Sequence, residues 1–124
     1  MTQPLALVVY EKLLPGSQLV NRLQDLNYRV QTTPNAESLM ACAEAETPML
    51  VLADLTSTHV DVCSVIDRLR QNPGTSHIPV IAFGPESAVE LHQAALAAGA
   101  VLATSETAIL SHLPELLEQA LHLE

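Results

Sequence analysis

Short apolar runs alternate with stretches of helical periodicity along this chain, and no other feature constrains the fold as much. Continuous apolar runs of this length suit strands that are covered on both faces, as in a parallel sheet. Apolar residues three and four positions apart then follow, which is the spacing of one helix face. The five strand-like runs are 5–10, 29–33, 49–53, 78–83 and 101–104. This order predicts an α/β fold of parallel βαβ units with right-handed crossovers.

The helical stretches carry start and stop signals. Pro15-Gly16-Ser17 is a start signal for a helix whose apolar stripe includes Leu19, Leu23 and Leu26. Gly99 is a typical stop for an alanine-rich helix over 86–98. Pro114 is expected in the first turn of the last helix, because a proline inside a helix costs about 3 kcal/mol. Further helices are expected over 36–46, 62–69 and 113–121, so the chain is predicted to be one domain, 1–124, with five helices.

The amino-acid composition limits the classes of partner that this protein is expected to bind. The net charge is −9, and the chain has no Trp, one Phe and two Tyr. A surface that follows a phosphate backbone or stacks bases is therefore not expected, and neither is nucleic-acid binding. The chain also contains a single lysine, Lys12.

Cysteine usage and hydropathy favour the cytoplasm. Cys42 and Cys63 lie in apolar, helix-like stretches and are interpreted as buried free thiols rather than a disulfide or redox pair. No basic segment followed by a long apolar run opens the chain, so no signal peptide is expected. The longest uncharged run of small apolar residues, 94–103, is far shorter than the roughly 18–20 residues that cross a bilayer. We expect a cytoplasmic protein with no membrane partner.

Ligands of such sheets sit beyond the carboxyl ends of the strands, so the residues after each run are the candidates for function. Asp54 directly follows the run 49–53 and is either a functional carboxylate or the N-cap of the next helix. Glu11 follows the first run and should lie near Asp54, unless it is a solvated surface residue. Two neighbouring carboxylates either attract a hard divalent cation or raise each other's pKa.

Other catalytic motifs are missing from the sequence. No histidine pair has the HExxH spacing, no serine sits in a GxSxG elbow, and the glycines form no phosphate-binding pattern. The histidines are interpreted as scattered surface residues: His59, His77, His92, His112 and His122.

Three segments carry a resemblance to a known family: 48–55 (PMLVLADL), 77–82 (HIPVIA) and 98–100 (AGA). With these segments, residues 5–122 resemble the receiver domain of bacterial response regulators, without large gaps. The resemblance implies a flavodoxin-like, doubly wound (βα)5 sheet with the strand order 2-1-3-4-5. It also implies a role in a two-component or phosphorelay pathway.

The resemblance implies that part of a phosphorylation site is present. Asp54 matches the phosphoacceptor of the family. The acidic pair that holds Mg²⁺ in a working receiver reads Tyr10-Glu11 here, so one acid is replaced and Glu11 is kept. The main-chain carbonyl of Thr56 matches the remaining protein ligand. Glu11, Asp54 and Thr56 could thus still form a weak Mg²⁺ site.

The rest of that site differs from the family. Its Thr or Ser position falls on Gly84, and its lysine position falls on Glu106, or on Ser105 with a slip of one. The proline and the switch aromatic of the family correspond to Thr107 and Ala103. At an effective dielectric of about 20, two unit charges about 4 Å apart interact by roughly 4 kcal/mol. A glutamate in place of the lysine turns that attraction toward a phosphoryl group into repulsion.

Two other arrangements of charge remain open. Lys12 could reach across the edge and replace the missing cation, although a solvent-facing position is the simpler interpretation. Alternatively, Glu11, Asp54 and Glu106 could form a divalent-metal site made of three carboxylates.

Three functions follow as hypotheses. The first is a degenerate, stand-alone receiver (a pseudo-receiver) that acts by protein–protein interaction with little or no dependence on phosphate, and that is not an enzyme. It would bind a histidine kinase or another signalling protein, or form a homodimer, through the face made by the fourth helix, the fifth strand and the fifth helix of the fold, which includes parts of 86–98 and 101–121 here. The second is a slow, self-phosphorylating receiver that uses Asp54 and Mg²⁺. The third, a flavodoxin-type binder of a small ligand, has only the hydroxyl-rich 56–58 in its favour.

Overall fold

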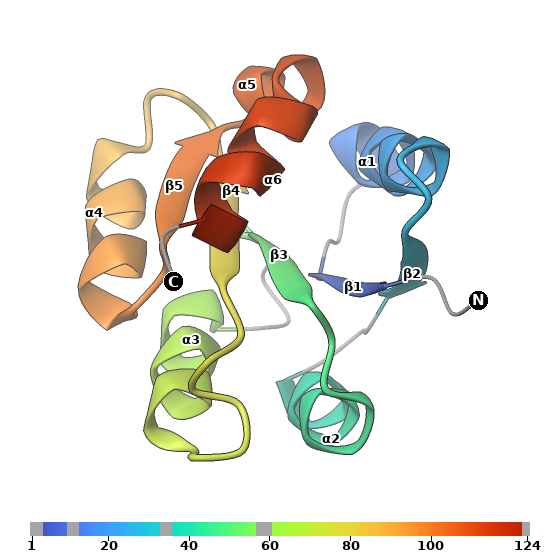
Figure 1. Ribbon diagram of the computed structural model, residues 1–124. Helices are drawn as coiled ribbons and strands as arrows, with labels where there is room; N and C mark the ends of the chain where they lie inside the picture. The colour runs from blue at the N-terminus through green and yellow to red at the C-terminus, as the bar shows by residue number, and fades with distance from the viewer. Residues whose placement is uncertain (1–3, 10–12, 33–35, 57–60, 123–124) are drawn as a thin grey trace.

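The structure is a computed structural model that describes residues 4–9, 13–32, 36–56 and 61–122. Its strands form one sheet in which every neighbouring pair is parallel, in the order β2-β1-β3-β4-β5 (Figure 1). This confirms the predicted flavodoxin-like fold class and strand order. The strands are β1 (Leu5–Val9), β2 (Arg29–Thr32), β3 (Leu50–Asp54), β4 (Val80–Gly84) and β5 (Leu102–Ser105).

Helices cover both faces of the sheet (Figure 1). Alternate residues of β1, β3 and β4 point to opposite faces, and all the residues of these three strands are buried. The core on one face joins the sheet to α1 (Leu13–Asp25), α5 (Glu106–Ser111) and α6 (Leu113–His122). The core on the other face joins it to α2 (Ala36–Glu46), α3 (Val62–Gln71) and α4 (Val89–Ala98). Burial on both faces explains why these strands read as continuous apolar runs.

Both ends of the first helix differ from the prediction. α1 begins at Leu13, so Pro15 and Gly16 lie inside its first turn rather than before it. A proline is tolerated there, because the first amide groups of a helix have no partner within the helix. α1 ends at Asp25, so Leu26 lies beyond the helix with 37 % of its surface exposed, outside the predicted stripe.

The fourth helix is shorter than predicted at its start. It begins at Val89 instead of residue 86, because Pro85 to Ala88 form a turn in which the Ala88 N–H donates to the Pro85 carbonyl at 2.9 Å. Its end at Gly99 is confirmed: the φ of Gly99 is +126°, a conformation that favours glycine.

The C-terminal segment holds two helices where one was predicted, so the described residues contain six helices instead of five. The additional helix, α5, begins directly after β5, because the Ser105 hydroxyl accepts a hydrogen bond from the Ala108 N–H at 3.0 Å and so caps it. α6 follows after His112, and Pro114 is its second residue, within the first turn as predicted. None of the helices in the described parts of the chain is long and apolar enough to span a membrane.

Candidate functional site

Asp54 is the last residue of β3 and one of the few buried polar residues. Only 1 % of its surface is exposed, and it pairs with Phe83 across the parallel ladder to β4. Its Oδ1 accepts two hydrogen bonds from Thr56, one from the main-chain N–H at 2.9 Å and one from the hydroxyl at 2.7 Å. Thr56 therefore fixes the carboxylate in a local turn at the end of the strand.

The second oxygen of this carboxylate, Oδ2, is buried and meets no hydrogen-bond partner among the residues that the structure describes. An unpaired buried acceptor costs about 1–3 kcal/mol, and more when it is charged. The alternative that Asp54 caps the next helix is wrong. The N-cap of α3 is Asp61, whose Oδ1 accepts from the Ser64 N–H at 3.3 Å. Asp54 therefore does not act as a helix cap.

Gly84 ends the neighbouring strand β4 and is buried. A Cβ atom placed on this glycine would lie 3.4 Å from Leu55 Cβ and 3.8 Å from His92 Nε2. Both distances are ordinary contacts, so the position could hold a small side chain. With glycine there, no side-chain hydroxyl projects from this position.

The end of β5 completes this edge of the sheet. Ser105 pairs with Gly84 across the ladder and at the same time caps α5. Glu106 is half-buried and lies in the first turn of that helix, where the partial positive charge of the N-terminus favours a carboxylate. The topology therefore brings Asp54, Gly84 and Glu106 to three adjacent strand ends, without a cationic side chain at the predicted lysine position.

Several predicted residues cannot be placed. Tyr10, Glu11 and Lys12 lie outside the described residues, and so does 57–60. Of the three predicted Mg²⁺ ligands, Asp54 fits in one respect, because its Oδ2 is a buried oxygen with no described partner. The alternative divalent-metal site made of Glu11, Asp54 and Glu106 also includes Glu11, so part of that site lies outside the described residues as well. Within the described ranges, no group of three or more His, Cys, Asp or Glu side chains could hold a metal ion.

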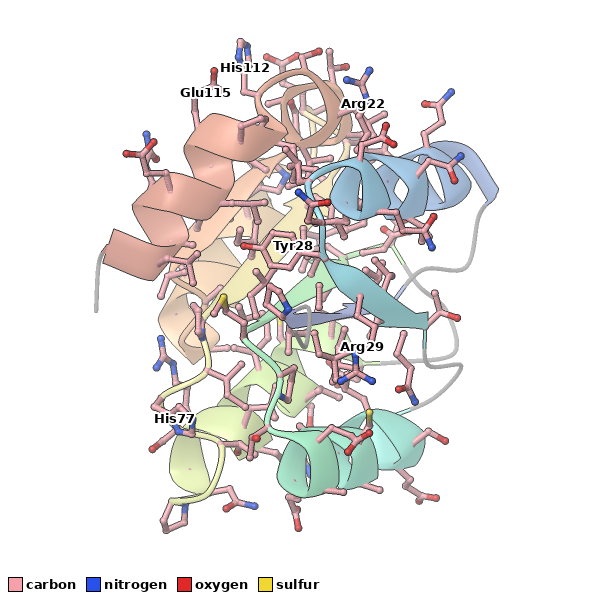
Figure 2. The ribbon with its side chains drawn as sticks, turned by 45° about the vertical axis from the view of Figure 1, so that its right-hand side comes forward. Arg22, Tyr28, Arg29, His77, His112 and Glu115 are labelled. Carbon is pink, nitrogen blue, oxygen red and sulfur yellow. The ribbon has the colours of Figure 1, made fainter. Side chains whose placement is uncertain are left out.

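His92, on α4, is a residue of this region that the sequence analysis missed. Its Nε2 is buried and has no hydrogen-bond partner in the described parts of the chain, although it was expected to be a surface residue. Its position depends on how α4 packs against the sheet, where His92 Nε2 lies 3.8 Å from the place of a Cβ on Gly84. No local sequence pattern predicts this packing, so the burial of His92 Nε2 could not be foreseen. By contrast, His77 and His112 are exposed and lie at opposite ends of the molecule (Figure 2).

Both cysteines lie on helices that cover the same face of the sheet. Cys42 on α2 and Cys63 on α3 are free thiols, as predicted, but half-buried rather than fully buried. Burial raises the pKa of Cys42, and the charge of Glu46 raises it further against a smaller opposite effect of Arg29. Burial also raises the pKa of Cys63, with a second contribution from Asp61.

Comparison with known proteins shows which proteins this chain is similar to. No family model matches the sequence. One curated relative, an uncharacterized 14.6 kDa protein in the sodA1 3′ region of Leptolyngbya boryana, is 32 % identical over 77 residues, or 62 % of this chain. The chain spans 59 % of the length of that relative.

Solved structures match the fold of this chain over nearly its whole length. The receiver domain of the sensor histidine kinase PA1611 from Pseudomonas aeruginosa, which has a magnesium ion in its active-site cleft, matches with a TM-score of 0.86 at 18 % identity, over 98 % of this chain and 99 % of that one. The receiver domain of NtrX from Brucella abortus matches with a TM-score of 0.82 at 20 % identity, over 96 % and 99 % of the two chains. A response regulator from Thermotoga maritima gives 0.80 at 20 % identity, over 98 % and 99 %. The chain therefore has the fold of a response-regulator receiver domain.

Proposed function

We propose that this chain is a receiver-like signalling module of a two-component or phosphorelay pathway, and that it acts by protein–protein interaction with little or no dependence on phosphorylation. It is one domain, 1–124, in the cytoplasm. Its partner is a histidine kinase or another signalling protein, and neither nucleic acid nor a membrane is a partner.

The composition of the carboxyl edge of the sheet carries this proposal. A phosphoryl group on Asp54 would face Gly84, which has no hydroxyl to donate, and the first turn of α5, where Glu106 stands in place of a cation. Like charges at such an edge oppose a second negative group. The receiver fold is kept, while two of the groups expected to stabilise an aspartyl phosphate are replaced.

The surface of α4 supports an interaction role. Large apolar side chains on this helix remain in contact with solvent: Val89, Leu91 and Leu96 are 55 %, 39 % and 48 % exposed. Most of the remaining residues of α4 are small, so a partner helix could approach it closely. We infer that the face made by α4, β5 and the two helices that follow it, α5 and α6, binds the partner or a second copy of this chain.

The test is a comparison of partner binding between the wild type and Asp54→Asn. Each is titrated with the receiver-binding domain of a histidine kinase, and its self-association is measured by sedimentation, with and without Mg²⁺ and phosphoramidate. The proposal expects the same affinity and the same oligomeric state in all four samples. A tenfold change on adding the phosphodonor, present in the wild type and absent from Asp54→Asn, would contradict it.

The second carboxylate oxygen of Asp54, Oδ2, favours a second candidate function, because no residue in the described ranges satisfies it. In that function Oδ2 would attack the phosphorus of a phosphodonor. We propose as the alternative a slow phosphoacceptor in which Asp54, Glu11 and the Thr56 carbonyl hold Mg²⁺. The bound Mg²⁺ would supply positive charge that shields the incoming phosphoryl group. Incubation with Mg²⁺ and phosphoramidate should then add one phosphoryl group, visible by mass, and Asp54→Asn should abolish the gain.

A further inference from the structure

The two carboxylate oxygens of Asp54 have different surroundings. Oδ1 accepts both hydrogen bonds from Thr56, one from the main-chain N–H at 2.9 Å and one from the hydroxyl at 2.7 Å. Oδ2 is buried and accepts none from the residues that the structure describes. An ionised carboxylate offers about four acceptor positions, about two on each oxygen. Thr56 therefore fills the positions on Oδ1 and leaves those on Oδ2 open.

Only one of these two hydrogen bonds depends on the side chain of Thr56. Any residue except proline would bring the main-chain N–H, whereas the hydroxyl belongs to threonine. The hydroxyl bond has the length of a charge-assisted O–H···O⁻ bond, about 2.5–2.7 Å, which is stronger than a bond between neutral groups. Asp54 is only 1 % exposed, so water has little access to replace this donor. The hydroxyl bond must break before Oδ1 can accept a second group.

The second function proposed above requires both oxygens of Asp54. Oδ2 forms the new bond to phosphorus as the P–N bond of phosphoramidate breaks, and the nitrogen leaves as ammonia, with the proton it needs taken from solvent. Once Oδ2 is bonded to phosphorus, Oδ1 is the only oxygen of this side chain that can still hold a cation. Because Thr56 fills both acceptor positions of Oδ1, the side chain cannot do so while the hydroxyl bond is intact.

We propose that the Thr56 hydroxyl is a positioning group that prevents Asp54 from holding a divalent cation and accepting a phosphoryl group at the same time. The inference rests on the site proposed above and deepens the first function, because it names a contact that lowers the response to phosphodonors. This contact is separate from the replacements at Gly84 and Glu106. Oδ1 can accept a cation only after the hydroxyl turns away.

The expected size of the effect follows from the hydrogen bond that is lost. A hydrogen bond to a charged group changes an equilibrium by about tenfold to a hundredfold. Mg²⁺ requires oxygen ligands in near-octahedral geometry, so it needs a free lone pair on each of them. Removing the hydroxyl frees one acceptor position on Oδ1, while the main-chain N–H keeps the other. The affinity for Mg²⁺ should rise by about tenfold, the lower end of this range.

The test measures the Mg²⁺ affinity of the full chain by NMR titration. Thr56→Val keeps the shape of the side chain without the hydroxyl and should bind Mg²⁺ about tenfold more tightly than the wild type. Thr56→Ala removes the same hydroxyl and should repeat the gain, and Asp54→Asn added to Thr56→Val should abolish it. Thr56→Ser keeps the donor and should match the wild type. Thr32→Val, at an exposed threonine of β2, is the matched control and should also match the wild type.

Phosphorylation gives a second measurement. With phosphoramidate and Mg²⁺, intact mass should show a larger labelled fraction for Thr56→Val than for the wild type, and no increase for Thr56→Ser. Equal or weaker Mg²⁺ binding by folded Thr56→Val and Thr56→Ala would overturn the inference and leave the first proposed function in place. Full labelling of the wild type, with a changed affinity for the kinase domain, would overturn that function. The ratio between the Mg²⁺ affinities of Thr56→Val and the wild type would still decide the inference.

Discussion

Gly99 holds a backbone conformation that a side chain would oppose for two separate reasons. Its φ of +126° lies in the region that favours glycine, and a Cβ there would overlap the Cγ of Arg70. The overlap matters, because Arg70 Nε donates to the Gly99 carbonyl at 2.7 Å and Nη1 donates to the Ser76 carbonyl at 2.7 Å. This one side chain connects α3 to the turns before β4 and β5.

We therefore expect Gly99→Ala to lower the free energy of unfolding by about 1–3 kcal/mol, through backbone strain and a displaced Arg70. Urea denaturation measures the change. Gly74→Ala is the matched control, because a Cβ there meets only Asn72 Oδ1 at 3.4 Å and the φ is not positive. An equal loss in the two variants would show that the clash with Arg70 contributes nothing.

The two cysteines give a prediction about pH. Burial, then the nearby carboxylates, raise the pKa of Cys42 and of Cys63, so less thiolate is present at a given pH than in the unfolded chain. Because the thiolate is the reactive form, iodoacetamide should alkylate both residues more slowly in the folded protein. The rates should keep rising at pH values where the urea-unfolded chain has already levelled off. Matching pH profiles in the two states would contradict the raised pKa.

At the scale of the elements, α5 depends on a single capping residue. Ser105 accepts from the Ala108 N–H at 3.0 Å, and the helix has only six residues, with Ile109 as its buried contact. A helix of this length is not stable without tertiary packing and capping. This cap fixes where β5 ends, and it also fixes the position of Glu106, the first residue of α5.

Ser105→Ala should thus destabilise the protein by about 1 kcal/mol, the usual effect of losing an N-cap. Differential scanning calorimetry measures the change, and hydrogen exchange of the α5 amides should accelerate in the variant. Ser111→Ala, at the exposed last residue of the same helix, changes the same side chain without removing a cap. If both variants lose the same stability, the cap has no special role.

The elements show which parts of this fold can be predicted from sequence. The buried strands and α3 follow from local patterns: Val62, Val65, Ile66 and Leu69 have helical spacing, and all four are buried. α5 could not be predicted in this way, because its one buried residue forms no periodic stripe. The place of Asp54 at the carboxyl end of β3 could be predicted, because the apolar run 49–53 directly precedes it. The approach of His92 to Gly84 depends on how α4 packs against the sheet, which is a long-range property of the structure.

At the scale of the whole molecule, a net charge of −9 acts against the compact state. Folding brings the acidic residues closer together, and this mutual repulsion is screened by salt. Part of the acidity lies at the carboxyl edge of the sheet, where Asp54 is buried and Glu106 is half-buried. The general repulsion and this local site should respond differently to monovalent and divalent cations.

Raising NaCl from about 10 mM to about 150 mM shortens the screening length to about 8 Å, and should therefore raise the Tm of this acidic protein. MgCl₂ at matched ionic strength separates the two effects. A cation that binds only the folded chain stabilises it further, by RT ln(1 + [L]/Kd). We expect an additional rise in Tm with Mg²⁺ in the wild type and none in Asp54→Asn, while both respond equally to NaCl. If Mg²⁺ raises the Tm of Asp54→Asn by the same additional amount, the Mg²⁺ effect belongs to other carboxylates. If NaCl lowers the Tm, charge repulsion does not limit the stability of this fold.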